Sequence, residues 1–162
     1  MRTLWTAVRA AIYAAGFIAL WAWLAHTAHL RDSRLGQYGP AWLPSVGVAL
    51  MVLGLALALA CVATFVVRGR GTPAPFDAPR VFVASGPYRW VRNPMYIGAF
   101  LALVGYALCG GSFTALGVAF LMLGLAHAFV VAYEEPNLER RFGASYAEYR
   151  RTTPRWIPRP PR

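Results

Sequence analysis

Long apolar runs alternate with short polar stretches along this chain. The first run predicts a helix over Leu4–His26, within which residues 10–24 carry no charge, and the second predicts a helix over Trp42–Val67. Each run reaches the ~20 mostly apolar residues that a helix needs to cross a bilayer. A cleaved signal peptide is the alternative for the first run, but the run is long and lacks a clear A-x-A cleavage site. The pattern therefore predicts two membrane-spanning helices in the first half of the chain.

Small residues recur at regular spacing in both predicted helices. In the second helix, Gly47 and Gly54 are seven residues apart and share a face, which favours packing against a neighbouring helix there. In the first helix, the small residues at a spacing of four are Ala7, Ala11, Ala15 and Ala19. Both stripes permit a close approach between helices.

The second half of the chain contains a shorter apolar run, a glycine turn and another long run. Asn93 predicts an N-cap, and the proline that follows it suits the first position of a helix over Pro94–Cys109. This helix rises ~24 Å, which is less than the ~30 Å hydrocarbon thickness. After the turn Gly110-Gly111, Ser112 predicts the cap of a helix that ends near Glu134. The two helices form an antiparallel hairpin, so the start of the shorter one and the end of the longer one share a side of the membrane.

The last predicted helix is amphipathic and covers Pro136–Thr152. Its apolar stripe, at spacings of four and three, consists of Leu138, Phe142, Tyr146 and Tyr149. Polar residues such as Arg140, Arg141, Glu148 and Arg151 occupy the remaining surface, a pattern typical of a helix that lies on a membrane. We expect the stripe to pack down and close a site from the cytoplasm.

The predicted fold class is all-α, an integral membrane bundle of four transmembrane helices plus a C-terminal amphipathic surface helix. A single membrane domain, residues 1–162, would contain two N-terminal helices in 1–67, a core in 68–155 and a tail in 156–162. Within the basic connection Arg68–Arg92, the segment Val81–Val83 would dip into the interface or cover a site.

Composition supports the membrane prediction. The chain has 162 residues, of which 58% are hydrophobic, and a mean hydropathy of +0.45, which is too apolar for an ordinary soluble domain. Its net charge is +10, and all sixteen basic residues are arginines that gather between the apolar runs. Such clustering indicates a membrane protein rather than a nucleic-acid binder, because no basic-aromatic reader motif is present.

Arginine placement predicts an orientation. If both termini and the Arg68–Arg92 loop share one side, fourteen arginines lie there and Arg31 and Arg34 alone lie opposite. The positive-inside rule makes the arginine-rich side cytoplasmic. We therefore expect a multi-pass protein of a bacterial-type inner membrane with both termini in the cytoplasm. Cys61 and Cys109 lie within apolar runs without C-x-x-C spacing, so neither a disulfide nor a zinc site is expected.

Candidate chemistry gathers at the two ends of the predicted hairpin. Arg89 and Arg92 precede the helix that begins at Pro94, and a helix N-terminus flanked by arginines attracts an anion. A positively charged interface loop is the simpler explanation of the same residues. At the other end, Glu134 and Glu135 follow an apolar helix, where two carboxylates are costly unless they are solvated or paired.

A positive and a negative pole side by side match a zwitterionic ligand. Adjacent helical residues point ~100° apart, so both glutamates cannot face one ligand equally. Glu135 precedes Pro136 and is expected to cap the next helix, which leaves Glu134 as the inward residue. The aromatic residues Tyr88, Trp90, Tyr96 and Tyr133 are candidates for adenine stacking or cation–π contact. S-adenosylmethionine fits this description, as do other zwitterions.

His127 is the remaining titratable group in this part of the chain, on the same face of its predicted helix as Glu134. An intramembrane histidine is a functional candidate, and a core histidine bonded to a neighbouring helix is the alternative. His26 and His29 are expected at the outer end of the first helix. No metal ligand set is predicted, because no further ligands accompany them.

Two motifs carry a specific resemblance. They read Gly86-Pro87-Tyr88-Arg89-x-Val91-Arg92-Asn93-Pro94-x-Tyr96-x-Gly98 and Glu134-Glu135-x-x-Leu138-x-x-x-Phe142-Gly143-x-x-Tyr146-x-x-Tyr149, followed by Pro154-Arg155. In this order they closely resemble the isoprenylcysteine carboxyl methyltransferase and phospholipid methyltransferase superfamily, over about residues 86–155. The resemblance implies a helical membrane bundle that transfers a methyl group from S-adenosylmethionine, leaving S-adenosylhomocysteine, to a lipophilic acceptor that arrives from the bilayer. It implies no metal.

The resemblance also implies the site. Carried over by position, the catalytic residues would be Arg92, Asn93 and Glu134. The cofactor-binding residues would be Tyr88, Arg89, Arg92, Asn93, Pro94, Tyr96, Gly98, His127, Glu134, Glu135 and Tyr146. Many members of the superfamily have histidine where this chain has Asn93, which keeps hydrogen-bonding capacity but does not titrate.

Two other functions stay open at this point. A membrane reductase of the sterol-reductase type, with a nicotinamide cofactor, has a related architecture, although this chain lacks a G-x-G-x-x-G motif. A non-catalytic membrane protein with a degenerate site is the other. The acceptor is equally open among phosphatidylethanolamine, a prenylated carboxylate, another isoprenoid and a small thiol, as is the oligomeric state.

Overall fold

A computed structural model describes residues 2–32, 40–69 and 82–160, and every regular element in these ranges is a helix. The order is α1 (Arg2–Asp32), α2 (Leu43–Thr64), η1 (Phe65–Gly69), η3 (Gly86–Arg89), α3 (Pro94–Gly110), α4 (Phe113–Phe129), η4 (Val130–Glu134), α5 (Glu135–Phe142) and α6 (Ala144–Thr152). The segments η1 and η4 are π-helical, and η3 is a 3₁₀-helix. The predicted all-helical class is confirmed for this part of the chain.

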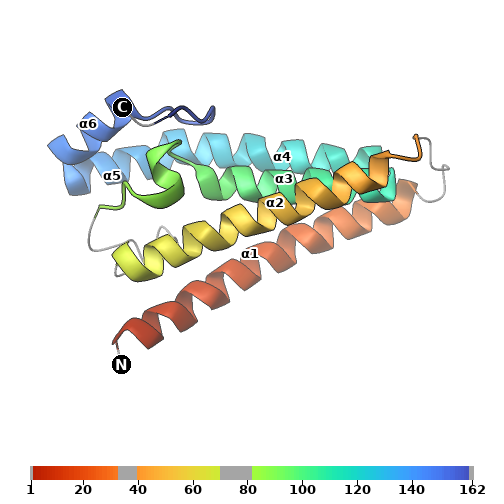
Figure 1. Ribbon diagram of the computed structural model, residues 1–162, viewed down its shortest axis with the longest axis horizontal. Coiled ribbons are helices and arrows are strands. Elements are labelled where there is room, and N and C mark those ends of the chain that lie inside the picture. The colour runs from red at the N-terminus through yellow and green to blue at the C-terminus, as the bar shows by residue number, and fades with distance from the viewer. Residues whose placement is uncertain (1, 33–39, 70–81, 161–162) are drawn as a thin grey trace.

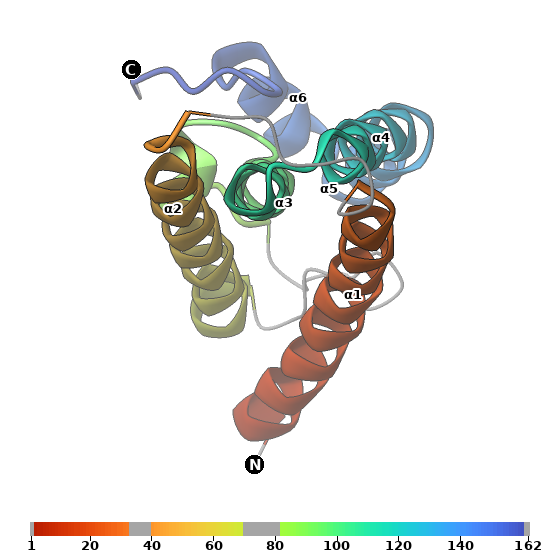
Figure 2. The same ribbon diagram turned by 90° about the vertical axis from the view of Figure 1, so that its right-hand side faces the viewer.

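Four long helices form the body of the molecule (Figure 1). Viewed along the bundle, α3 lies between α2 and α4, while α1 packs on α4 and α3 and slants away toward its N-terminus (Figure 2). The short helices α5 and α6 gather at one end of the bundle, and the chain begins and ends there (Figure 1). The predicted hairpin of α3 and α4 is present, with Gly111 in the left-handed conformation at its turn.

Three segments are long and apolar enough to cross a membrane: Ala11–Asp32, Leu43–Arg68 and Phe113–Phe142. A further apolar helix, Pro94–Gly110, is shorter. It has 17 residues and rises ~25 Å, as the sequence predicted. Large apolar side chains point outward from these helices, including Leu59 at 69% exposure. An outward apolar surface of this kind fits lipid, so the chain is a multi-pass membrane protein.

Glycines bring α2 and α3 into backbone contact. A Cβ atom on Gly47 would lie 2.6 Å from the carbonyl oxygen of Gly105, and one on Gly54 would collide as closely with the carbonyl oxygen of Gly98. No residue other than glycine fits these positions without separating the helices. The predicted packing of the second helix through Gly47 and Gly54 is therefore confirmed.

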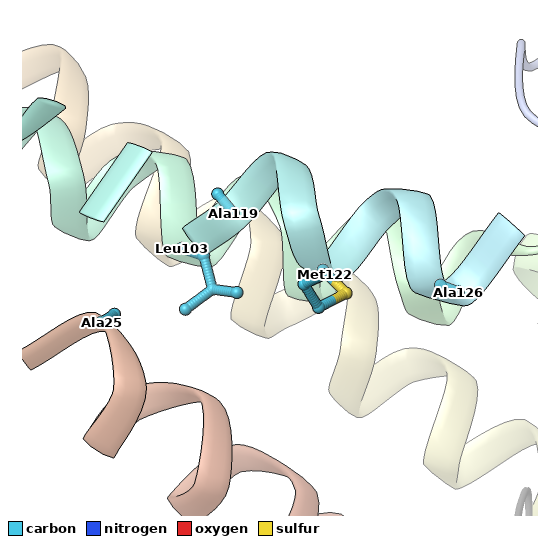
Figure 3. Packing of buried hydrophobic residues seen from close by; sticks show 5 residues of the cluster. All are labelled: Ala25, Leu103, Ala119, Met122 and Ala126. Atoms are coloured by element: carbon cyan, nitrogen blue, oxygen red, sulfur yellow. The ribbon is translucent and has the colours of Figure 1, made fainter. Parts of the chain in front are cut away.

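A second contact region joins α1, α3 and α4 through small and apolar side chains. Figure 3 shows its buried residues, which are Ala25, Leu103, Ala119, Met122 and Ala126. On α1, the packing residues are thus in the C-terminal third of the helix. The predicted alanine stripe is wrong for its described members, because Ala11, Ala15 and Ala19 are exposed.

Helix α1 continues six residues beyond the predicted end, because its last residue binds α4. The Asp32 carboxylate accepts a 2.7 Å hydrogen bond from the Thr114 backbone N–H and further bonds from the Ser112 and Thr114 hydroxyls. A carboxylate is favoured at a helix N-terminus. The predicted cap is also confirmed, since the Ser112 hydroxyl oxygen accepts a bond from the Ala115 N–H.

The predicted helix over Pro136–Thr152 is wrong in one respect. Two helices, α5 and α6, replace it, because Gly143 adopts φ 52° and ψ −125° between them. Only glycine adopts this conformation readily. The break lets α6 fold back beside α5, so the predicted apolar stripe still gathers in one place, described next.

Candidate functional site

A cavity of about 370 Å³ lies at the end of the bundle where η1, η4, α5 and α6 meet. Its wall is rich in aromatic side chains: Phe65, Phe82, Tyr88, Tyr133, Phe142, Tyr146 and Tyr149. Its polar residues are Arg92, Asn93, Glu134, Glu135, Asn137, Arg140 and Arg141, and Val83, Val130 and Leu138 complete it. The loop before α3 and the end of α4 thus meet at one cavity, as the hairpin predicted.

Six of the eleven predicted site residues line this cavity: Tyr88, Arg92, Asn93, Glu134, Glu135 and Tyr146. The other five do not. Arg89 is exposed, Pro94 is buried, and Gly98 packs against α2. Tyr96 and His127 do not line the cavity either, and their contacts are given below.

Glu135 lies between two guanidinium groups. Arg92 Nη1 is 2.9 Å from Glu135 Oε1, and Arg155 donates to both carboxylate oxygens at 2.8 and 2.9 Å. The Glu135 and Arg92 side chains are buried, with 9% and 10% exposed. The carboxylate raises the pKa of the Arg155 guanidinium above its usual range by accepting these bonds. Glu135 therefore holds the cavity wall together rather than capping α5 as the sequence suggested.

Glu134 has very different surroundings. Its Oε2 atom accepts one hydrogen bond, 3.3 Å long, from the Tyr96 hydroxyl. Among the described residues, no arginine or histidine forms an ion pair with it. Glu134 is therefore a carboxylate at the cavity without a cationic partner in this part of the chain.

Both glutamates reach the cavity at the point where the π-helical segment η4 passes into α5. In a regular α-helix, adjacent side chains point ~100° apart, which is why the sequence predicted a single inward residue. A π-helix has a wider turn, and such segments occur frequently at functional sites. Here the π turn ends at Glu134 and α5 begins at Glu135, and both side chains line the cavity.

A cluster of aromatic rings around Phe82 forms part of the cavity wall. The Phe82 ring lies 5.4 Å from Phe142, 5.9 Å from Tyr146 and 5.1 Å from Tyr149, measured between ring centroids. The Tyr149 hydroxyl donates a 2.7 Å bond to the Tyr88 carbonyl oxygen. Burial raises the pKa of Tyr149 and of Tyr146, so both phenols stay neutral. Of the segment predicted to dip into the interface or cover a site, Phe82 and Val83 line the cavity, and residue 81 lies outside the described residues.

The C-terminal tail, Thr153–Pro160, binds the loop before α3. The Arg92 N–H donates to the Pro154 carbonyl at 2.8 Å, and the Arg159 N–H donates to the Trp90 carbonyl at 3.0 Å. Asn93 does not cap α3 with its side chain, contrary to prediction; its amide donates to the Arg155 carbonyl at 3.1 Å instead. The tail thus fixes the loop that carries Arg92 and Asn93.

Trp156 connects the tail to α3 and α4. Its indole N–H donates to His127 Nδ1 at 3.0 Å, and its ring centroid is 6.5 Å from that of Tyr96. His127 is therefore bonded to another segment and is not one of the residues that line the cavity. Sequence reasoning assigned no role to Arg155 or Trp156, although Pro154-Arg155 belongs to the recognised motif.

Potential metal ligands and cysteines add no second centre in the described part of the chain. No three His, Cys, Asp or Glu residues among residues 2–32, 40–69 and 82–160 form a metal-binding group. Cys61 and Cys109 are both free, as predicted, and Cys61 is fully buried.

The chain is thus a multi-pass helical bundle with a polar, aromatic-walled cavity at one end, where residues of both recognised motifs meet. Residues 42–145 match the model of the phospholipid methyltransferase family, which is more than half of the chain, so this chain belongs to that family. The tail lies beyond the matched residues.

Curated relatives agree with this assignment in part. The chain is 33% identical over 78 residues to protein-S-isoprenylcysteine O-methyltransferase of Schizosaccharomyces pombe, covering 48% of this chain and 33% of that protein. It is 27% identical over 127 residues to the nickel-cobalt-cadmium resistance protein NccN of Alcaligenes xylosoxydans xylosoxydans, covering 76% of this chain and 55% of the relative. It is 30% identical over 126 residues to the cobalt-zinc-cadmium resistance protein CzcN of Cupriavidus metallidurans, covering 76% and 54%. The chain thus spans about half the length of these two resistance proteins, and a third of the methyltransferase.

Proposed function

We propose that this protein transfers a methyl group from S-adenosylmethionine to a lipophilic acceptor at the membrane surface. The observation that supports the proposal is the cavity itself. It joins both motifs of the family, is walled by aromatic rings, and carries one carboxylate without a cationic partner among the described residues. An aromatic wall with an uncompensated carboxylate suits a ligand that combines an aromatic base with a cationic centre.

The residues present also fit the ligand's carboxylate. Arg92 lines the cavity, and its buried Nε atom has no hydrogen-bond partner in the described part of the chain. A buried donor without a partner is costly unless a ligand satisfies it. Arg92 would therefore hold a carboxylate while Glu135 fixes its guanidinium, and Glu134 would face the positive centre.

The cofactor supplies a methyl carbon that is already activated by its bond to a sulfonium sulfur. The remaining work of the protein is to align an incoming nucleophile with that carbon and to exclude water. The ring cluster around Phe82 and Tyr149 closes one side of the cavity, and the arginine clamp on Glu135 fixes the other. Neither contact requires a metal ion.

Cofactor binding tests the proposal directly. Isothermal titration of the detergent-purified protein with S-adenosylhomocysteine should show one binding site, and titration with a reduced nicotinamide nucleotide should show none. Nicotinamide binding in place of S-adenosylhomocysteine would favour the reductase alternative. Failure to bind either ligand would favour a non-catalytic membrane protein.

We further propose that both termini and the cavity face the cytoplasm of a cell with an inner membrane. The arginine distribution supports this orientation, as does the position of the start of α1 and of α5 and α6 toward the same end of the bundle (Figure 1). In a variant without Cys61 and Cys109, a membrane-impermeant thiol reagent should label Ala41→Cys but not Ser145→Cys in intact cells. The reverse labelling pattern would reject the orientation.

A further inference from the structure

The loop before α3 and the C-terminal tail carry two arginines outside the cavity. Arg89 and Arg159 are both exposed, and neither lines the cavity. The Arg159 N–H donates to the Trp90 carbonyl at 3.0 Å, so the two arginines belong to backbone segments that contact each other. Together with two exposed apolar residues of the same segments they form the loop–tail surface, which consists of Arg89, Trp90, Ile157 and Arg159.

No acidic side chain among the described residues neutralises these two arginines. The ion pairs at this end of the bundle join other residues: Glu135 with Arg92 and Arg155, Glu139 with Arg150, and Glu148 with Arg151. Within the described part of the chain, the guanidinium groups of Arg89 and Arg159 form neither an ion pair nor a hydrogen bond. The loop–tail surface thus offers two positive charges to a ligand.

The apolar residues of the loop–tail surface indicate where that ligand lies. Trp90 is 48% exposed and Ile157 is 75% exposed. The neighbouring Trp156 binds His127 of α4 and packs near Tyr96 of α3, so the tail lies against apolar helices. Tryptophan and arginine side chains together are typical of the headgroup level of a membrane, where the ring meets the acyl boundary and the guanidinium meets phosphate.

The tail that carries Arg159 also fixes the wall of the cavity. The Pro154 carbonyl accepts the Arg92 N–H at 2.8 Å, and the Arg155 side chain binds both oxygens of Glu135 at 2.8 and 2.9 Å. A phosphate group can accept hydrogen bonds from two guanidinium groups at once. A phosphate that joined the two arginines of the loop–tail surface would hold the tail against the loop and thereby keep Arg155 on Glu135.

We propose that the loop–tail surface binds the headgroup of an anionic phospholipid in the leaflet on the cavity side, and that this lipid strengthens cofactor binding by holding the tail in place. An anionic lipid is favoured over a zwitterionic one, because an ammonium group in the headgroup offsets the attraction of its phosphate to the arginines. The effect on the cofactor rests on the methyl transfer proposed above, whereas the lipid site does not. The lipid is a bound ligand here, separate from the methyl acceptor.

Lipid selectivity tests the site directly. Full-length protein would be placed in lipid discs of mixed phosphatidylcholine and phosphatidylglycerol, released into detergent and analysed for retained lipid by native mass spectrometry. The wild type should retain phosphatidylglycerol in preference. Arg89→Gln and Arg159→Gln should each reduce this preference roughly fivefold, the effect of one arginine at an anionic surface. The matched control for their double variant is Arg150→Gln with Arg151→Gln, which removes two exposed arginines that are paired with glutamates and should keep the preference.

Cofactor affinity tests the effect of the lipid on the cavity. The dissociation constant for S-adenosylhomocysteine would be measured in discs of phosphatidylcholine alone and in discs that also contain phosphatidylglycerol. Phosphatidylglycerol should lower it by at least about fivefold in the wild type and in the control, and should leave it unchanged in the double variant of Arg89 and Arg159. Inorganic phosphate added to phosphatidylcholine discs should have no effect, because a free anion lacks the acyl chains that would lie beside Trp90 and Ile157.

Every other outcome also decides. Equal lipid preference in the wild type and the double variant of Arg89 and Arg159 would overturn the site, and so would an equal loss in the control, which would mean that net charge alone attracts the lipid. An effect of inorganic phosphate as large as that of the lipid would overturn the assignment to a lipid. Protein that selects phosphatidylglycerol but binds S-adenosylhomocysteine equally in both discs would overturn the effect on the cavity. Protein that selects phosphatidylglycerol and binds no S-adenosylhomocysteine in any disc would reject the proposed function and support the lipid site, so the two failures are distinguishable.

Discussion

Backbone lies against backbone where α2 meets α3, whereas ion pairs, aromatic rings and a few backbone hydrogen bonds hold the walls of the cavity together. Along α2 and α3, glycines at positions 47, 54, 98 and 105 leave no room for an added atom. Around the cavity, Glu135, its two arginines and a cluster of aromatic rings connect α5, α6, the tail and the loop before α3. The first region sets the distance between two helices, and the second sets the shape of a ligand site.

The two regions should therefore fail in different ways. A close-packed interface between helices is lost when any side chain is introduced, because the helices must separate over their whole length. A wall of ion pairs and rings tolerates the loss of one contact with a local rearrangement. Substitutions in the first region should change folding, and those in the second should change ligand affinity more than folding.

The largest effect is expected at Gly54. Gly54→Leu places a side chain where the Gly98 carbonyl oxygen lies, and should destabilise the protein by about 3 kcal/mol or more. Thermal unfolding in detergent measures this. Gly124 is the matched control, because a Cβ atom there meets nothing within 4 Å. Gly124→Ala should be neutral or stabilising by up to about 1 kcal/mol. A Gly54→Leu protein as stable as the wild type would mean that α2 and α3 do not touch.

The next largest effect is expected at Arg155. Arg155→Gln removes the forked partner of Glu135 and leaves only Arg92, which should cost roughly 2 kcal/mol, less than for a fully buried pair because Arg155 is one-third exposed. Affinity for S-adenosylhomocysteine should fall as well. Arg150→Gln is the control, because its pair with Glu139 is exposed and should contribute less than about 1 kcal/mol. Equal effects of the two substitutions would contradict the clamp.

A smaller effect is expected at Trp156, on the bond between the tail and α4. Trp156→Phe keeps a ring but removes the indole donor to His127, and should cost about 1 kcal/mol. A double-mutant cycle with His127→Phe isolates that bond, because the second substitution should add little once the first is made. Additive effects would show that the bond contributes nothing to stability.

The smallest effect is expected at Tyr149 and depends on pH. Tyr149→Phe removes the bond to the Tyr88 carbonyl and should cost about 0.5–1 kcal/mol at pH 7. Burial raises the pKa of Tyr149 in the folded protein, so its contribution is fully present below the ordinary tyrosine value of ~10 and is lost as pH rises above it. The free energy of unfolding can be measured with denaturant from about pH 8 to about pH 11. It should fall less steeply with rising pH for Tyr149→Phe than for the wild type. Equal pH dependence in the two proteins would mean that Tyr149 is exposed to water in the folded protein.

Local features of the fold were predictable because their causes are close in sequence. The apolar runs predicted the long helices, and Ser112 predicted the cap of α4. The spacing of Gly47 and Gly54 predicted the face of α2 that packs on its neighbour. The residues that gather at the cavity followed from a motif resemblance together with the hairpin. Neither source needs information about distant contacts.

Features decided by distant partners were missed. Asn93 is a good N-cap by type, but the tail offers its amide a carbonyl 62 residues away. Glu135 has the position of a cap, yet two arginines bind it more strongly than a helix end would. Gly143 looked like an ordinary residue within an amphipathic pattern, and only the backbone shows that it separates two helices. For Asn93 and Glu135, the partner of the side chain lies far away in the sequence, so the local sequence could not reveal it.

The π-helical turn Val130–Glu134 makes the length of α4 part of the site. A π turn holds one residue more than an α turn, so deleting a residue from Val131–Tyr133 should restore a regular helix. Because this deletion removes only the extra residue of the π turn, the helix beyond it should keep nearly its present direction and leave Glu135 beside Arg92. A deletion from the regular part of α4 would instead turn everything beyond it by ~100° about the helix axis and draw it back ~1.5 Å. Glu135 would then swing away from Arg92, although every residue of both motifs would still be present.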